Sequence, residues 1–234
     1  PYMSSDAEFS DGRILTEYGD PFLTQKVRLD LGGGFKGGLL THRNMLEGDW
    51  DETVKGFYGF GDKQFGGLRL KRLYLGNYRV AFGLGLVMDN TDFMLFRKTG
   101  YGWNVRPIGV RGDLSRTREF ALTGGAVEGS YGRLHGTFFA STGRKDGILN
   151  DDDDPRRPGD QRTVNQYILM FPRLSEGYLR DYIDATGTGL RRNAFREDIL
   201  GGNLKLLLGE GTYVGVTGYE ARYDRAFRAD VNTL

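Results

Sequence analysis

Residues 25–34 read QKVRLDLGGG, and this stretch decides the fold class because its polarity alternates without a break. Charged and apolar side chains take turns along it: Lys26, Val27, Arg28, Leu29, Asp30 and Leu31. A period of two places the charged residues on one face of an extended chain and the apolar residues on the other. The three glycines that follow suit a tight turn, because glycine adopts a positive φ without steric cost. Residues 25–31 and 35–43 are therefore predicted to form a β-hairpin.

Three more hairpins are expected further along the chain. Residues 65–75 and 78–87 are predicted to pair around Gly76-Asn77, residues 119–128 and 133–142 around residues 129–132, and residues 202–208 and 213–223 around residues 209–211. This gives about eight strands of roughly eight to eleven residues, close to the ~9–11 residues that a tilted strand needs to cross a bilayer.

The strand expected over residues 78–87 indicates what the sheet faces. Large apolar residues share one of its sides: Tyr78, Val80, Phe82, Leu84 and Leu86. The opposite side carries small residues and one charge: Arg79, Ala81, Gly83, Gly85 and Val87. This pattern favours a barrel wall with its large residues toward lipid and its small residues toward a crowded lumen. A soluble β-rich module stays open as the alternative.

Composition agrees with a β architecture. The 234 residues include 37 glycines, 6 prolines and 13% aromatic residues, and mean hydropathy is −0.47. Low hydropathy is compatible with a membrane barrel, because lumen-facing polar residues alternate with lipid-facing apolar ones. No apolar run approaches the ~20 residues of a transmembrane helix. The net charge of +1 gives no field that would attract nucleic acid. The absence of cysteine excludes a thiolate metal site.

These observations predict an all-β fold, an antiparallel up-and-down transmembrane β-barrel with long loops and little helix. Residues 1–234 are expected to form one such domain or part of one. The last residues, 230–234, lack the terminal aromatic with which barrel proteins commonly finish, so the chain is expected to be a piece of a larger barrel.

Two irregular stretches are expected. A long loop insertion over about residues 143–201 includes a stretch with helical character at residues 191–199, and transmembrane barrels accommodate such insertions at one end. Residues 90–117 are expected to fold into the lumen or to cap it. The insertion is also the expected contact for other envelope proteins.

The order of these motifs resembles a family of bacterial outer-membrane proteins that carry an N-terminal helix-hairpin-helix domain ahead of a barrel. The likeness covers about residues 27–223, and four short motifs carry it: LGNYRVAFGLGLV at 75–87, GVRG at 109–112, TGLRR at 188–192 and LGGNL at 200–204. The helix-hairpin-helix domain itself is not in this sequence, and four consecutive aspartates in the insertion depart from the pattern. The resemblance implies an outer-membrane location and a barrel fold, and no catalytic residue comes with it.

Basic residues are the main candidates for lumen-facing charges: Arg69, Lys71, Arg79, Arg133, Lys205 and Arg222. Positive walls bias a pore toward anions. The alternative is pairing with carboxylates such as Glu119 or Glu220. Aromatic residues near the expected strand ends form a candidate interfacial girdle: Phe65, Tyr74, Tyr78, Tyr131, Tyr213, Tyr219 and Tyr223.

Candidates for chemistry are few. A hydrolase needs a base, and only His42 and His135 are present; His42 is expected at an exposed rim and His135 as a polar wall residue. A weak calcium loop is conceivable at Asp151, Asp152, Asp153 and Asp154, but the run lacks the spaced ligands of a calcium-binding loop. The glycines of residues 56–61 are expected to be strand and turn residues, because no Lys-Ser pair follows them.

The function expected from the sequence is that of an outer-membrane protein acting as a passive channel, an uptake component or a structural subunit of an envelope assembly. Its partners would be outer-membrane lipid and envelope proteins, with no nucleic acid, no cofactor and no metal site. The alternatives are an outer-membrane hydrolase with a rim histidine and a soluble β-rich binding module.

Overall fold

The fold is an antiparallel β-sheet. The computed structural model describes residues 23–43, 53–82, 87–88, 90, 109–116, 121–150, 163–167 and 190–228. Within these ranges there are ten strands and no helix: β1 (Leu23–Gly32), β2 (Phe35–Arg43), β3 (Thr53–Phe65), β4 (Leu68–Ala81), β5 (Gly109–Gly112), β6 (Leu122–Tyr131), β7 (Leu134–Leu149), β8 (Val164–Tyr167), β9 (Leu190–Gly209) and β10 (Thr212–Tyr223).

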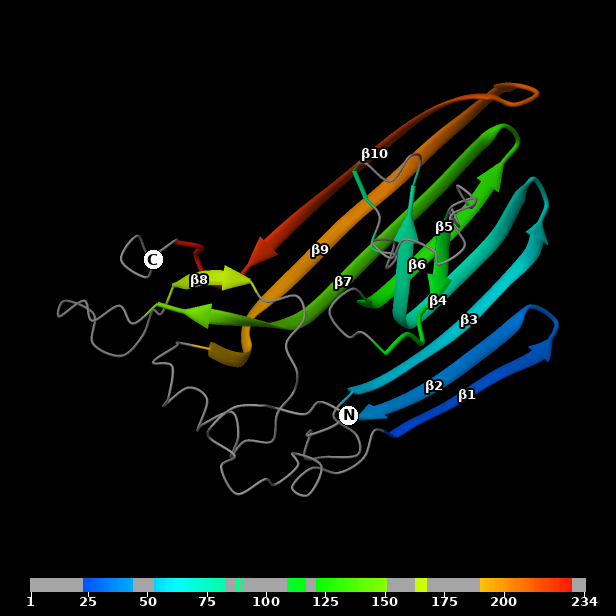
Figure 1. Cartoon of the computed structure of the whole chain (residues 1–234). Coiled ribbons are helices and arrows are strands. Elements are labelled where there is room, and N and C mark those ends of the chain that lie inside the picture. The colour runs from blue at the N-terminus through cyan, green and yellow to red at the C-terminus, as the bar shows by residue number, and fades with distance from the viewer. Residues whose placement is uncertain are drawn as a thin grey trace, which may run out of the picture.

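The strands follow an up-and-down order. Eight of them lie side by side as β1-β2-β3-β4-β6-β7-β9-β10, while the short β5 pairs with β4 and the short β8 with β7. Every pairing between these strands is antiparallel. Four tight turns link β1–β2, β3–β4, β6–β7 and β9–β10, and all four gather at one end of the sheet, at the upper right of Figure 1.

The two faces of the sheet follow from the strand register, because directly opposed residues on neighbouring strands share a face. One face carries apolar side chains that are open to the surroundings, and we call it the apolar face; Leu39, Leu75, Phe138 and Leu204 lie on it. The opposite face, the packed face, is covered over its central part by the protein's own side chains and segments.

The packed face holds two hydrophobic clusters. The larger is built from β4, β5, β6 and β7 around Tyr78, Val80 and Phe139, none of which is measurably exposed. The smaller lies where the far ends of β7 and β9 meet β8, around Val164 and Phe195. The burial that stabilises this sheet is therefore one-sided within the described residues.

The predicted hairpin at Gly76-Asn77 is wrong. β4 runs straight through this dipeptide, and the turn lies ten residues earlier, at Gly66-Gly67. Asn77 stays in the strand because its side-chain carbonyl accepts a hydrogen bond from Gly56 N at 2.9 Å and its amide donates to Thr123 Oγ1 at 3.0 Å. A local turn signal was thus overridden by contacts from two neighbouring strands.

Two other expectations are corrected. The residues with expected helical character, 191–199, belong to the strand β9, which pairs with β7 on one side and β10 on the other. Tyr78, Val80 and Phe82 do not face outward as expected, because all three are buried in the larger cluster of the packed face. Leu84 and Leu86 lie outside the described residues.

The pairing of the other three expected hairpins is confirmed, although the turn expected at residues 129–132 lies at residues 132–133. β1 pairs with β2, β6 with β7, and β9 with β10, each across a glycine-containing turn. Strand β7 reaches Leu149 and β9 begins at Leu190, so the connection between them is shorter than the expected 143–201 insertion, and it contains β8.

The sheet is open at both edges. Within the described residues β1 pairs only with β2 and β10 only with β9, so the structure shows a sheet and not a closed barrel. The same residues contain no helix with the length and apolar character needed to cross a bilayer.

Candidate functional site

The apolar face is the most unusual surface of the described structure. It exposes large hydrophobic side chains on every long strand, among them Leu31 at 74% and Val216 at 71%. Its exposed members are Val27, Leu29, Leu31, Phe35, Leu39, Val54, Tyr58, Phe65, Leu68, Leu75, Val127, Tyr131, Leu134, Phe138, Leu200, Leu204, Leu206, Leu208, Val214 and Val216. A contiguous apolar surface of this extent marks a binding or membrane-contact surface.

The apolar face ends at a row of polar residues on the side away from the tight turns. Strand register places them opposite one another from β4 to β10: Asn77, Thr123, Thr142, Asp198 and Arg222. On β9 the apolar stretch runs from Leu200 to Leu208. Eight steps of about 3.3 Å give about 26 Å along the strand. Transmembrane barrels carry an apolar band about 25 Å tall.

At the turn end, the packed face carries charged residues instead of a hydrophobic core. We call this set the charged belt: Asp30, Lys36, Asp62, Arg69, Lys71, Arg72, Glu128, His135 and Lys205. Register aligns two of its rows across the sheet, one through Arg69, His135 and Lys205, and one through Arg72 and Glu128. The charged belt therefore contains five cationic side chains and three carboxylates.

Short contacts hold the charged belt together. Arg69 Nη2 donates to Asp62 Oδ1 at 2.6 Å, and Lys71 Nζ lies 2.7 Å from His135 Nδ1. Glu128 lies between Lys71 and Arg72, with its carboxylate oxygens 3.9 Å and 3.7 Å from their nitrogens. Lys205 Nζ lies over the Tyr213 ring, 3.8 Å from its centroid.

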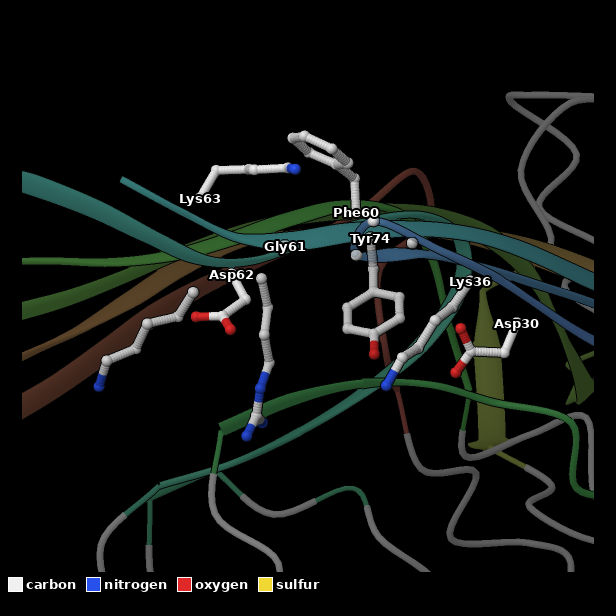
Figure 2. Close-up of a pocket in the computed structure, with 12 residues that line it drawn as sticks. Asp30, Lys36, Phe60, Gly61, Asp62, Lys63 and Tyr74 are labelled. Carbon is white, nitrogen blue, oxygen red and sulfur yellow. The ribbon is translucent and has the colours of Figure 1, made fainter. Parts of the chain in front are cut away.

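A hollow of about 500 Å³ opens within the charged belt, beside β1, β2, β3 and β4. Figure 2 shows Lys36, Asp30, Asp62 and Tyr74 on one side of the ribbon, and Phe60 with Lys63 on the other. The side chains of Lys71 and Arg72 complete the polar lining. The hollow therefore offers mainly cationic groups to a solute.

A chain segment crosses the packed face next to this belt. Residues 109–116 pair with β4 through β5 and then continue over β3. Lys55 Nζ donates to Asp113 Oδ2 at 2.6 Å and to Ser115 Oγ at 3.1 Å, and Arg79 Nε lies 2.8 Å from Asp113 Oδ1. Lys55 is 1% exposed and the Asp113 side chain 6%. This buried ion cluster fixes the segment against the sheet.

The ionisation of Asp113 follows from its neighbours. Burial acts to raise the pKa of its carboxyl group, but the charge and hydrogen bond of Lys55, the charge of Arg79 and the hydrogen bond of Ser115 together hold that pKa below its ordinary value of 3.8. The carboxylate is therefore ionised at neutral pH, as a partner for two buried cations must be.

The predicted lumen-facing charges lie in four different places. Arg69, Lys71 and Lys205 come together in the charged belt. Arg79 belongs to the buried cluster with Asp113, and Arg133 is exposed in the turn between β6 and β7. Arg222 shares the apolar face and pairs with Glu220 at 2.9 Å, as the pairing alternative anticipated. Glu119 lies outside the described residues.

The histidines lie apart from each other. The expectation of an exposed rim position for His42 is wrong, because it is 1% exposed on β2 with Thr24 Oγ1 2.8 Å from its Nδ1. His42 shares a side of β2 with Leu40, so its side chain lies on the packed face. His135 lies on the packed face with Thr137, as the alternation predicted.

Only two members of the expected aromatic girdle lie exposed on the apolar face, because the register places Tyr74, Tyr213, Tyr219 and Tyr223 on the packed face. Phe65 and Tyr131 are exposed at 61% and 66% beside the tight turns, where an interfacial ring would lie. Tyr78 is fully buried, and its hydroxyl donates to Ala140 O at 2.7 Å, so its place in the girdle is wrong.

Several predicted features fall outside the described residues. These are the aspartates 151–154 and Gly83 with Gly85. Among the residues that are described, no group of three or more histidine, aspartate or glutamate side chains is placed to hold a metal ion. The glycines of residues 56–61 lie within strand β3, as expected.

Sequence reasoning missed Lys36, Lys55, Arg72, Asp113 and Glu128. Alternation alone could have found Lys36, because Lys36, Gly38 and Leu40 share a side of β2. Arg72 was hidden because a bulge between Leu70 and Arg72 places two consecutive residues, Lys71 and Arg72, at the charged belt. Asp113 carries no local signal, because its partners lie 34 and 58 residues away.

Comparison with protein-family models, with curated proteins and with solved structures finds no match in any of the three.

Proposed function

We propose that the chain forms part of the wall of a bacterial outer-membrane β-barrel that acts as a passive channel, an uptake component or a structural subunit of the envelope. One observation carries the proposal. At the turn end of the sheet, charged side chains lie on the packed face while large apolar side chains lie exposed on the opposite face. In a water-soluble antiparallel sheet, the apolar side chains normally lie on the covered face and the charged side chains on the exposed face.

The exposed apolar side chains make this face unfavourable in water. Burying one leucine or valine side chain contributes roughly 1.5–3 kcal/mol, so leaving a whole face uncovered in water is unfavourable. Lipid tails satisfy this face without a protein partner. The polar row at Asn77, Thr142 and Asp198 then lies where the apolar band meets the headgroups.

Turn and loop lengths support the same orientation. Transmembrane barrels carry short turns at one end and long loops at the other. Here the four tight turns lie at one end of the sheet. The longer connections, between β2 and β3, β4 and β5, and β7 and β9, join strands at the opposite end. The short turns are therefore assigned to the periplasmic side.

Barrel closure is part of the proposal. Unpaired backbone groups of an open edge are costly in a hydrocarbon environment, so a membrane sheet closes on itself. β1 and β10 run in opposite directions, because they are the first and the last of eight strands that alternate in direction. Antiparallel pairing at this seam, directly or through further strands, extends the same up-and-down order.

The packed face would then line the interior. Its charged belt and the segment 109–116 narrow the passage, and solutes would pass by diffusion without covalent chemistry. The long connection after β7 remains the proposed contact for envelope proteins. The resemblance to outer-membrane proteins with a helix-hairpin-helix domain implies the same membrane.

The test is heat-modifiable migration of the detergent-extracted protein, followed by conductance in a planar bilayer. The proposal expects a compact band that shifts on boiling and stepwise current after insertion. A chain that stays monomeric and soluble without detergent and shows no shift contradicts the membrane assignment. If the protein is heat-modifiable but gives no current, the result supports the structural role and contradicts the channel.

A further inference from the structure

The hollow in the charged belt holds more positive charge than its own carboxylates neutralise. Asp62 forms an ion pair with Arg69, and both side chains are exposed. Glu128 serves Lys71 and Arg72 together, at distances beyond an ordinary hydrogen bond. Within the described residues, Lys36 has no carboxylate oxygen within 4 Å. Asp30 is the remaining acid, and its side chain accepts from Gly32 N at 3.2 Å.

The floor of the hollow is shaped by two glycines of β3. A Cβ at Gly59 would meet the Tyr74 ring at 2.6 Å, and a Cβ at Gly61 would meet Lys71 O at 2.3 Å. These positions therefore stay bare, and the chain packs the Tyr74 ring against the floor. The tyrosine hydroxyl adds a neutral donor beside Lys36 (Figure 2).

The donors suit an anion with several oxygens. Arg72 uses one of its five N–H groups on Val110 O at 3.0 Å. Lys71 is held by His135, and Lys36 approaches from β2, which is separated from β4 by β3. Guanidinium and ammonium groups are the donors that phosphate and carboxylate oxygens bind in proteins.

We propose that this hollow is a binding site for the phosphate or carboxylate group of a solute, held by Lys36, Lys71 and Arg72. The inference deepens the proposed function, because it rests on the packed face being the interior that solutes reach. The site concentrates anions at one level of the passage, and Asp30 limits how tightly they are held.

Binding is measured on the full chain folded in detergent, by equilibrium dialysis with radiolabelled inorganic phosphate and, separately, with acetate at low ionic strength. The double variant K36Q/K71Q removes two of the three cations, and its affinity is expected to fall by roughly tenfold or more, since hydrogen bonds to charged groups contribute strongly. The variant D30N removes the opposing carboxylate and is expected to bind more tightly.

Lys63→Gln is the control. It removes one positive charge at the border of the same hollow, but the Lys63 side chain lies on the other side of the sheet from Lys36, with its ammonium 5.9 Å from the Phe60 ring centroid (Figure 2). K63Q is expected to bind like the wild type. The assignment of this site is contradicted if K63Q and K36Q/K71Q lose the same affinity for the anion. It is also contradicted if the wild type binds neither anion saturably. Preference for phosphate or for acetate decides which oxyanion it takes.

The dialysis readout separates this inference from the proposed function. Saturable binding that depends on Lys36 and Lys71, in a protein that forms no heat-modifiable barrel, supports the site and overturns the membrane assignment. Stepwise current from a protein that lacks saturable binding supports the channel and overturns the site.

Discussion

At the residue scale, Gly76 shows why one position in the middle of a strand is restricted to glycine. Its φ is +99°, and an added Cβ would lie 2.3 Å from Gly56 O, a backbone atom of the neighbouring strand. A side chain here meets both an unfavourable backbone conformation and a clash that no rotamer relieves.

Gly76→Ala is therefore expected to destabilise the folded chain by at least about 1–2 kcal/mol. The measurement is the urea unfolding midpoint in detergent. Gly143→Ala is the control, because nothing lies within 4 Å of its Cβ position and its φ is ordinary. Equal midpoints for the two variants would contradict the steric account of Gly76.

Asp113 governs a second residue-scale prediction. Removing its charge leaves Lys55 and Arg79 buried without this partner, so Asp113→Asn is expected to cost about 3–5 kcal/mol at pH 7. The control is Asp62→Asn, whose ion pair with Arg69 is exposed and is expected to matter little.

The pH dependence has a definite sign. Because the folded-state pKa of Asp113 lies below 3.8, its contribution is fully present above that value and is lost as pH falls through the folded-state pKa. The difference in unfolding free energy between wild type and D113N should narrow as pH falls below about 3.8. A difference that stays constant down to the acid limit would show that the Asp113 charge is not what stabilises the segment.

At the element scale, strand β9 distinguishes a lipid-facing sheet from a water-facing one. Leu204 and Leu208 lie on the same face and are about equally exposed, at 49% and 52%. Leu204 is at the middle of the apolar stretch, whereas Leu208 is next to the turn. In water, arginine at either position should have a similarly small effect.

In a bilayer the two positions differ. Leu204→Arg is expected to cost about 2–4 kcal/mol and Leu208→Arg about 0–1 kcal/mol, because the cost of a lipid-facing arginine depends on depth. The measurement is the equilibrium free energy of folding into lipid vesicles. Equal costs at the two positions would contradict the proposed membrane band.

Elements also show where prediction from sequence succeeded and failed. The hairpins at residues 32–34 and 209–211 were predictable because a glycine-containing turn separates two strand-like stretches in each case. The Gly76-Asn77 signal is equally strong locally, but Asn77 serves as a cross-strand hydrogen-bond partner, which only the register reveals. Residues 191–199 mix charges and apolar residues without a clear period, so the pairing of β9 with β7 decides their structure.

At the scale of the whole molecule, the antiparallel up-and-down order was predictable from the spacing of turns, whereas the packed face was not. The large residues at 78–82 appeared to face lipid because alternation gives two faces without saying which one is covered. The covering segment, 109–116, comes from a distant part of the chain. Its position was anticipated only in general terms, as a stretch that folds into the interior.

The account stands on one claim, that the apolar face contacts lipid. The sequence has no cysteine, so a single spin label can be placed at each position from 200 to 208 in turn. In vesicles, the account predicts high accessibility to oxygen at Leu200, Leu204, Leu206 and Leu208, and low accessibility at Gly201, Asn203, Lys205 and Leu207. Uniform accessibility to a water-soluble nickel reagent along the whole strand, with no two-residue period for oxygen, would contradict it.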